Sequence, residues 1–277
     1  MTAGIPLLMS GSSYFPLPFV RNAGHGPGVV CLHSNASSSS QWRGLMELLA
    51  PRFRVFAPDS YGAGKSPQWP SDRQISLADE VALIEPVLRD AGPPLALVGH
   101  SYGAAIALRA ALDRPERVRA LVLYEPTLFC LLDAEAPPPN ASEGIRSAVA
   151  EASLALDRGD RNRAAEAFID YWMGEGAWQR MPEPRREPIA TSIVNVRRWA
   201  HALLTEPTPL QAFRTLDAPV LYLTGAKTTA SARAVARLLV ATLPRVELRE
   251  FEQLGHMGPV THPEQVNAAI AGFLGTA

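Results

Sequence analysis

Residues 97–105 read Leu-Val-Gly-His-Ser-Tyr-Gly-Ala-Ala, which places a Gly-x-Ser-x-Gly motif around Ser101. An apolar run with strand character, Leu95 to Val98, leads into the motif, and an alanine-rich run with helix character, Ala104 to Leu112, follows it. A serine on such a sharp strand-to-helix turn needs small neighbours, because the backbone there is strained. The turn holds the hydroxyl clear of the sheet and puts the next amide at a helix N-terminus, ready for an anion. This context predicts that Ser101 is a nucleophile.

The length and composition of the chain fit one large α/β domain with room for an insertion. Its 277 residues are 47% apolar and carry a formal net charge of -1. Such a charge gives no electrostatic reason to expect binding to nucleic acid or to an anionic membrane. No apolar stretch approaches the roughly 20 residues of a membrane span. We therefore expect a protein with no nucleic-acid partner and no membrane partner.

The N-terminus and the cysteines predict a cytoplasmic protein without a metal or a cofactor. Met1 to Val20 has no basic region and is interrupted by three prolines, unlike a secretory signal peptide. The two cysteines, Cys31 and Cys130, are too few for a disulfide framework or a metal knuckle. We expect Cys31, in an apolar run, to be a small core residue.

Strand and helix patterns alternate along the first half of the chain, which is typical of a mostly parallel sheet with helices on both faces. Leu7 to Val20 is expected to form a leading antiparallel pair. The alternation stops after the apolar strand Val118 to Tyr124, and from Ser142 to about Glu206 only helical patterns occur. It resumes with the strand Val220 to Thr224. A purely helical insertion after one strand of such a sheet is typical of a cap.

The insertion divides the chain into two expected units. Residues 1–126 and 212–277 are predicted to form the α/β core, and residues 127–211 a helical cap, or lid. Because the insertion follows the strand after the elbow helix, we expect the cap to lie over Ser101.

A serine hydroxyl needs a base, and a neutral imidazole oriented by a carboxylate is the usual solution. Among the six histidines, His256 lies in a Leu-Gly-His-Met-Gly loop between the last predicted strand and the last predicted helix. In doubly wound sheets this is the carboxyl edge, where ligands bind. His262 immediately precedes Pro263 and fits a helix start instead. The sequence therefore predicts His256 as the base.

At this point the chain resembles the α/β-hydrolase superfamily over nearly its whole length. The elbow at residues 99–103 and the late Gly255-His256 match the family pattern. So do Asp-Ser-Tyr-Gly-Ala-Gly-Lys-Ser at residues 59–66 and His-Ser-Asn at residues 33–35. The resemblance implies an α/β-hydrolase fold, with a mostly parallel eight-stranded sheet, helices on both faces and an inserted helical cap. It says little about the substrate.

The acid is where the sequence departs from the family pattern. In most members the resemblance implies an aspartate shortly after the glycine that ends the strand Val220 to Gly225, but residues 225–232 contain no carboxylate. Glu125 ends the strand that follows the elbow helix, at the same edge, and some superfamily members place their acid there. We therefore predict Glu125 as the acid. Asp59 is the main alternative, although its loop is most often structural, and Asp217 precedes a strand and lies at the wrong edge.

An acyl intermediate also needs hydrogen-bond donors for its oxyanion. One expected donor is the backbone N–H of Tyr102, directly after the nucleophile. The resemblance implies that the other is the N–H of Asn35, two residues past His33. Ser34 stands where the family usually has glycine. We expect His33 to be a structural residue at a strand end rather than a second base.

Large apolar side chains are frequent in the predicted cap. We expect Phe129, Trp172 and Trp199, together with Met257 beside the histidine, to line a covered and mostly apolar substrate pocket. The alternative is that such residues, at helical spacing, form the internal core of the cap.

These features predict a serine hydrolase of the carboxylesterase type that acts through an acyl-enzyme on a small or medium apolar ester. A carbon–carbon bond hydrolase and a cofactor-free perhydrolase use the same triad, and the sequence does not separate them. The alternative from another class is a non-catalytic protein that binds or senses a small molecule on a hydrolase scaffold. The absence of an acid near Thr228 supports that alternative, whereas Ser101 and His256 argue against it. The expected partner is a small apolar carbonyl compound.

Overall fold

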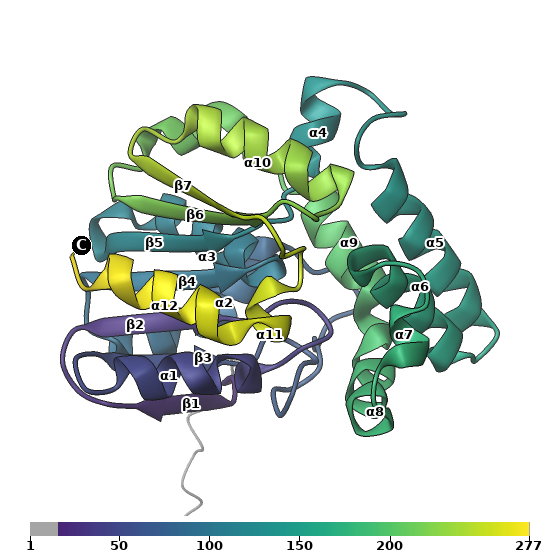
Figure 1. Cartoon of the computed structure of the whole chain (residues 1–277), viewed down its shortest axis with the longest axis horizontal. Coiled ribbons are helices and arrows are strands. Elements are labelled where there is room, and N and C mark those ends of the chain that lie inside the picture. Colours follow the sequence, from purple (N-terminus) through teal and green to yellow (C-terminus); the bar gives the residue numbers. More distant parts are fainter. Residues whose placement is uncertain (1–15, 277) are drawn as a thin grey trace, which may run out of the picture.

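A seven-stranded sheet organises residues 16–276, the part of the chain that this computed structural model describes (Figure 1). The strand order is β1-β3-β2-β4-β5-β6-β7, with β1 antiparallel to β3 and every other neighbouring pair parallel. The strands are β1 Val20–Ala23, β2 Gly28–Leu32, β3 Arg54–Pro58, β4 Leu95–His100, β5 Val118–Tyr124, β6 Val220–Gly225 and β7 Val246–Phe251.

The sheet confirms the mostly parallel α/β prediction but differs from it in one detail. Within residues 16–276 it has seven strands, not eight. The leading antiparallel pair expected over Leu7 to Val20 falls mostly outside the described residues. The antiparallel strand that is described, β1, starts at Val20 and pairs with β3 from the Val20–Pro58 register onward.

Helices cover both faces of the sheet, so its central strands are buried on both sides and read as continuous apolar runs. One core cluster joins the sheet to α1 and α12, and the other joins it to α2, α3 and α10. Figure 1 shows α1 and α12 together on one face. The bounds of these helices are α1 Arg43–Leu49, α2 Leu77–Asp90, α3 Tyr102–Asp113, α10 Ala230–Thr242 and α12 Pro263–Leu274. Short 3-10 turns span Ser39–Trp42, Pro115–Arg117 and Leu210–Thr215.

The helix α2 shows how local sequence sets these elements. Ser76 caps its first turn, because its side chain accepts from the Asp79 N–H while the Asp79 carboxylate accepts from the Ser76 N–H. Apolar residues such as Leu77 and Ile84 recur on one face of this helix, and that face is buried. Glu80 lies on the same buried face.

Residues 125–219, all of them described, form helices and loops without a strand. Figure 1 shows α5 to α9 gathered beyond one end of the sheet. This end carries the carboxyl termini of the parallel strands, because Trp172 of α6 contacts His256 in the loop after β7. The helices are α4 Cys130–Glu135, α5 Glu143–Asp157, α6 Arg161–Met173, α7 Ala177–Arg180, α8 Glu183–Ser192 and α9 Val196–Leu204, with a 3-10 turn at Ile193–Asn195. The short helix α11, Gly258–Thr261, lies between the His256 loop and α12.

Candidate active site

The predicted nucleophile Ser101 lies between β4 and α3, with φ +56° and ψ -114°. This backbone conformation is rare for a residue with a side chain, and such strain is concentrated at functional sites. The flanking glycines are required by close packing. A Cβ on Gly99 would lie 2.4 Å from the Ala104 Cα, and one on Gly103 would lie 2.3 Å from the Leu32 carbonyl oxygen. The Gly-x-Ser-x-Gly motif is therefore the elbow that its sequence context predicts.

His256 is within hydrogen-bond distance of Ser101, with 2.9 Å between Nε2 and the serine Oγ. Both residues are buried, with His256 1% exposed and Ser101 5% exposed. Two hydrogen bonds hold the histidine loop in place. The Tyr124 hydroxyl donates to the Gly255 carbonyl at 2.7 Å, and His100 Nε2–H donates to the His256 carbonyl at 2.8 Å. Burial, together with the nearby His256, keeps the pKa of His100 well below its usual range, so His100 acts here as a neutral donor.

Glu125 completes a continuous hydrogen-bonded chain. Its Oε2 lies 2.7 Å from His256 Nδ1, the nitrogen opposite the one that faces Ser101. Glu125 is fully buried and has φ +44°, a second strained position at the edge of the sheet. The arrangement fixes the imidazole tautomer: Nδ1–H donates to the carboxylate, and Nε2 is free to accept the serine proton.

Three other donors converge on the Glu125 carboxylate. Oε1 accepts from the Thr224 hydroxyl at 2.9 Å and from the Gly225 N–H at 2.8 Å, and Oε2 accepts from the Thr228 hydroxyl at 2.6 Å. Burial alone would raise the pKa of this carboxyl. The hydrogen bonds from His256, Gly225 and Thr228 outweigh that effect and lower it. Glu125 is therefore ionised at neutral pH.

The two threonines were not expected from the sequence. The stretch after Gly225 drew attention only because it lacks a carboxylate. The structure shows that it supplies hydroxyl donors instead, Thr224 just before the glycine and Thr228 three residues after it. Hydroxyl residues in place of the usual acid were the available signal.

The alternative acid, Asp59, is engaged elsewhere. Its Oδ1 accepts from the Ser39 N–H at 2.6 Å, and its Oδ2 accepts from the Lys65 N–H at 2.9 Å. Asp59 therefore connects the loop after β2 to the loop after β3. Asp217 lies before β6, at the opposite end of the strands from His256.

The amides expected to bind an oxyanion flank the serine. The N–H of Tyr102 belongs to the first turn of α3, where a helix offers no internal acceptor. Asn35 lies in the turn after β2 and lines the same cavity as Ser101. Ser34, which replaces the usual glycine, anchors this turn because its N–H and its hydroxyl both donate to Gln41 Oε1, at 3.2 and 3.1 Å.

His33 has both ring nitrogens bound to backbone groups. Nδ1–H donates to the Ser34 carbonyl at 2.7 Å, and Nε2 accepts from the Ser60 N–H at 3.1 Å. Burial lowers its pKa, which keeps the ring neutral. These contacts agree with a structural role at the strand end.

A small cavity of about 20 Å³ adjoins Ser101. This is room for about one water molecule. Its wall is mostly apolar and comes largely from the helices between β5 and β6. Met257, which the sequence predicted to line the pocket, does not line this cavity. Its side chain is half-buried and packs against the core cluster that joins the sheet to α2, α3 and α10. The lining residues are Asn35, Ser101, Thr127, Phe129, Ile145, Val149, Phe168, Trp172, Val196, Trp199, Ala200, Leu203 and Leu204.

The indole of Trp172 also covers the imidazole of His256. The two ring centroids are 3.8 Å apart, and the planes are inclined by 23°. The helical segment therefore reaches the histidine directly, as well as the space beside the serine.

The family model for the alpha/beta hydrolase fold matches residues 27–263. The chain belongs to the α/β-hydrolase family. This match covers both parts of the sheet and the helices between them.

Relatives of this α/β hydrolase include proteins named as an ester hydrolase and as a semialdehyde hydrolase. A pimeloyl-(acyl-carrier protein) methyl ester esterase from Nitrosomonas europaea is 27% identical over 255 residues, or 89% of this chain and 95% of that protein. A 2-hydroxymuconate semialdehyde hydrolase from Pseudomonas sp. strain CF600 is 28% identical over 271 residues, or 95% of this chain and 88% of that protein. An esterase from Exiguobacterium antarcticum superposes with a TM-score of 0.77 over 93% of this chain and 95% of its own, at 19% identity, which shows the shared fold.

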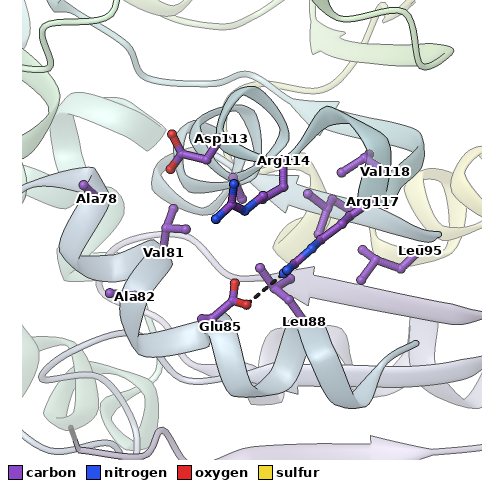
Figure 2. Close-up of a pocket in the computed structure, with 12 residues that line it drawn as sticks. Ala78, Val81, Ala82, Glu85, Leu88, Leu95, Asp113, Arg114, Arg117 and Val118 are labelled. Atoms are coloured by element: carbon purple, nitrogen blue, oxygen red, sulfur yellow. Dashed lines mark hydrogen bonds and ion pairs between the residues drawn. The ribbon is translucent and has the colours of Figure 1, made fainter. Parts of the chain in front are cut away.

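A larger depression of about 490 Å³ lies elsewhere on this hydrolase, between α2 and α3 (Figure 2). Its residues include Leu95 and Val118, the first residues of β4 and β5, so it opens at the amino ends of the strands. The ion pair between Glu85 and Arg117, at 2.8 Å, crosses it. No serine, cysteine or histidine is among its lining residues, all of which lie in the described part of the chain. The small cavity beside Ser101 is therefore the candidate active site.

Across residues 16–276 no group of three or more histidine, cysteine, aspartate or glutamate side chains could hold a metal ion. In the same part of the chain, every helix is too short or too polar to cross a bilayer.

Proposed function

We propose that this α/β hydrolase is a serine esterase in which Ser101 is the nucleophile, His256 the general base and Glu125 the acid that orients the histidine. The observation that carries the proposal is the chain from Ser101 Oγ to His256 Nε2, 2.9 Å, and from His256 Nδ1 to Glu125 Oε2, 2.7 Å. Both distances lie within the range needed for proton transfer.

In the first half of the proposed reaction, Ser101 Oγ attacks the ester carbonyl while His256 Nε2 takes the serine proton. The resulting imidazolium is stabilised by the ionised Glu125. The tetrahedral intermediate then expels the alcohol, which takes the proton from Nε2, and an acyl-serine remains.

In the second half, His256 removes a proton from a water molecule, which attacks the acyl carbonyl. The intermediate collapses, and Ser101 regains its proton from the imidazolium as the acid leaves. In both halves the carbonyl oxygen carries negative charge. The N–H groups of Tyr102 and Asn35 are proposed to bind it, since fixed donors in a dry site stabilise such charge strongly.

We further propose that residues 127–211 are a cap over a core formed by residues 1–126 and 212–277. The support is that helices from this segment provide most of the cavity wall. A cavity with room for about one water molecule cannot hold an ester, so the cap, or the aromatic side chains it carries, must move for substrate to enter.

The proposed substrate is a small or medium ester with an apolar acyl group. Phe129, Trp172 and Trp199 supply a wall that would contact such a group. Relatives named as ester hydrolases support this choice. A carbon–carbon bond hydrolase is a second candidate, because it would use the same Ser101, His256 and Glu125, and because a relative named as a semialdehyde hydrolase and not as an esterase aligns over almost the whole chain. A cytoplasmic location remains a prediction from the sequence.

The test combines a covalent probe with a substrate series. The wild-type protein should be labelled by a fluorophosphonate, which requires an activated serine, and should hydrolyse p-nitrophenyl esters. The Ser101→Ala variant should melt at the wild-type temperature but show neither activity. Ester turnover within tenfold of wild type in Ser101→Ala would overturn the proposal. Labelling without turnover of any ester would transfer the assignment to another carbonyl substrate, and absence of labelling would favour a binding protein.

A further inference from the structure

A buried carboxyl group contacts the residue that follows the nucleophile. Glu80 is in the first turn of α2 and is 1% exposed. Its Oε1 accepts from the hydroxyl of Tyr102, the residue after the nucleophile, at 3.1 Å. Its Oε2 accepts from the N–H of Tyr61, in the loop after β3, at 3.2 Å. Glu80 therefore connects the start of α3 to the loop after β3.

Hydrogen bonds connect the same loop to the turn that carries Asn35, whose N–H is the second donor of the proposed oxyanion hole. Ser60, next to Tyr61, donates its N–H to His33 Nε2 at 3.1 Å. His33 in turn donates Nδ1–H to the carbonyl of Ser34 at 2.7 Å, and Ser34 precedes Asn35. One run of hydrogen bonds and backbone thus joins Tyr102, through Glu80 and His33, to Asn35.

We propose that Glu80 is a positioning residue, which fixes the spacing of the Tyr102 and Asn35 N–H groups around the developing oxyanion. This inference rests on the function proposed above. The physical reason is that donors stabilise an oxyanion only when they are held at about 2.7–3.1 Å from the position it will occupy. A buried carboxyl with two bonded neighbours can hold that geometry, whereas an apolar side chain would leave both neighbours unpaired.

The protonation state of Glu80 makes glutamine its close mimic. Burial raises the pKa of this carboxyl to about 8, and the bonds from Tyr61 and Tyr102 offset only part of the effect. At pH 7 the group is therefore largely neutral. A neutral carboxyl has one accepting oxygen and one hydroxyl, and glutamine has one accepting oxygen and one NH₂. The Tyr61 N–H needs the accepting oxygen, whereas the Tyr102 hydroxyl can accept as well as donate, so Glu80→Gln can preserve both links.

Four variants test the inference. Glu80→Leu removes both links, Tyr102→Phe removes one and keeps the backbone N–H, and Glu80→Gln keeps both. Glu85→Leu is the matched control, because Glu85 lies five residues further along α2 and pairs with Arg117 in the depression of Figure 2, away from the serine. Each protein is titrated with a fluorophosphonate, so that rates are expressed per active serine and a loss of folded protein is not counted.

The expected result is a fall of about tenfold or more in kcat per titrated site for Glu80→Leu and Tyr102→Phe, with KM changed less than threefold. Affinity for a trifluoromethyl ketone, which forms a tetrahedral adduct with serine, should fall in parallel with kcat. Glu80→Gln should recover to within about threefold of wild type, and Glu85→Leu should match wild type.

If these residues only stabilised the fold, the Glu80→Leu and Tyr102→Phe substitutions would lower the melting temperature and the number of titrated sites. They would leave both kcat per site and ketone affinity unchanged. That result in Tyr102→Phe would overturn the inference even if Glu80→Leu does not fold. A Gln variant as impaired as the Leu variant would also overturn it. A wild-type protein that fails to react with the fluorophosphonate is a failure of the proposed function itself, so the two failures are distinguishable.

Discussion

The Glu125 carboxylate lies 2.7 Å from His256 Nδ1, although the strands that precede these residues, β5 and β7, are separated by β6. The side chain crosses the end of β6, and the Gly225 N–H at that end donates to it. Glutamate is one methylene longer than aspartate, which helps it span this gap. Glu125 can therefore contact His256 from β5, although β6 lies between their strands.

The Glu125→Gln variant should retain its fold and lose most of its turnover. Its amide can direct an N–H toward His256, which favours the tautomer with the proton on Nε2, where the base is needed. Loss of tautomer control can cost up to about 10⁴ in rate. Steady-state kinetics on p-nitrophenyl acetate measure the effect, with circular dichroism to verify folding. Turnover within tenfold of wild type would show that Glu125 is not the acid.

An acid placed after β6 should partly rescue that variant. Thr228 Oγ1 lies 2.6 Å from the same Glu125 oxygen that His256 Nδ1 contacts, so an aspartate at this position can approach the histidine. We expect Glu125→Gln/Thr228→Asp to turn over esters at least about tenfold faster than Glu125→Gln alone. Thr228→Asp by itself should be destabilised, because two carboxylates would then share one buried site. Equal rates for the double and the single variant would contradict this prediction.

Widening the cavity should change the preferred acyl length. Trp199, on α9, is buried and lines the cavity, so Trp199→Ala removes a wall. The ratio of kcat/KM for p-nitrophenyl octanoate over butyrate should rise by about tenfold, since one methylene group is worth about 10–200-fold in a fitted pocket. The loss of a buried tryptophan should also cost about 3–5 kcal/mol of stability.

Trp178→Ala is the matched control for that experiment. Trp178 is equally buried and lies in the same helical segment, but it does not line the cavity. It should lose comparable stability without a change in acyl preference. A chain-length profile that shifts equally in both variants would mean that Trp199 acts through the stability of the cap and not through the pocket.

The stability of the protein should carry a pH signature from Glu80. Its carboxyl titrates near 4.5 in an unfolded chain and, because burial raises its pKa, at about 8 in the folded one. Between these values the folded state holds the extra proton, so stability is full below about pH 4.5 and falls as pH rises toward 8. Glu80→Gln removes this dependence. Urea unfolding at several pH values should show the free energy of unfolding of the variant rising relative to that of wild type, by up to about 1.4 kcal/mol per pH unit in this window. If the free energy of unfolding depended on pH in the same way in both proteins, the raised pKa of Glu80 would be contradicted.

Much of the fold could be predicted because local patterns determine it. The Gly-x-Ser-x-Gly turn, the strand-helix alternation and the helical stretch after Tyr124 each depend on a few neighbouring residues. The position of Glu125 followed from topology, since the carboxyl ends of parallel strands meet at one edge.

The parts that escaped prediction depend on contacts between distant segments. The threonine donors to Glu125 come from β6 and from the loop after it, and neither composition nor spacing shows where a hydroxyl points. Met257 adjoins His256 in sequence, yet it is not among the residues that line the cavity. The role of Glu80 was not predicted from the sequence. It lies three residues after Leu77, on the apolar face, and a polar residue there was the available signal.

The stack between Trp172 and His256 joins an emitting side chain to the group whose charge changes during the proposed reaction. An imidazolium accepts an electron from an excited indole far more readily than a neutral imidazole does. Fluorescence from Trp172 should therefore dim each time His256 carries the serine proton and brighten when it gives the proton up. The protein contains its own optical probe, and stopped-flow emission can follow proton transfer at the histidine without any added label.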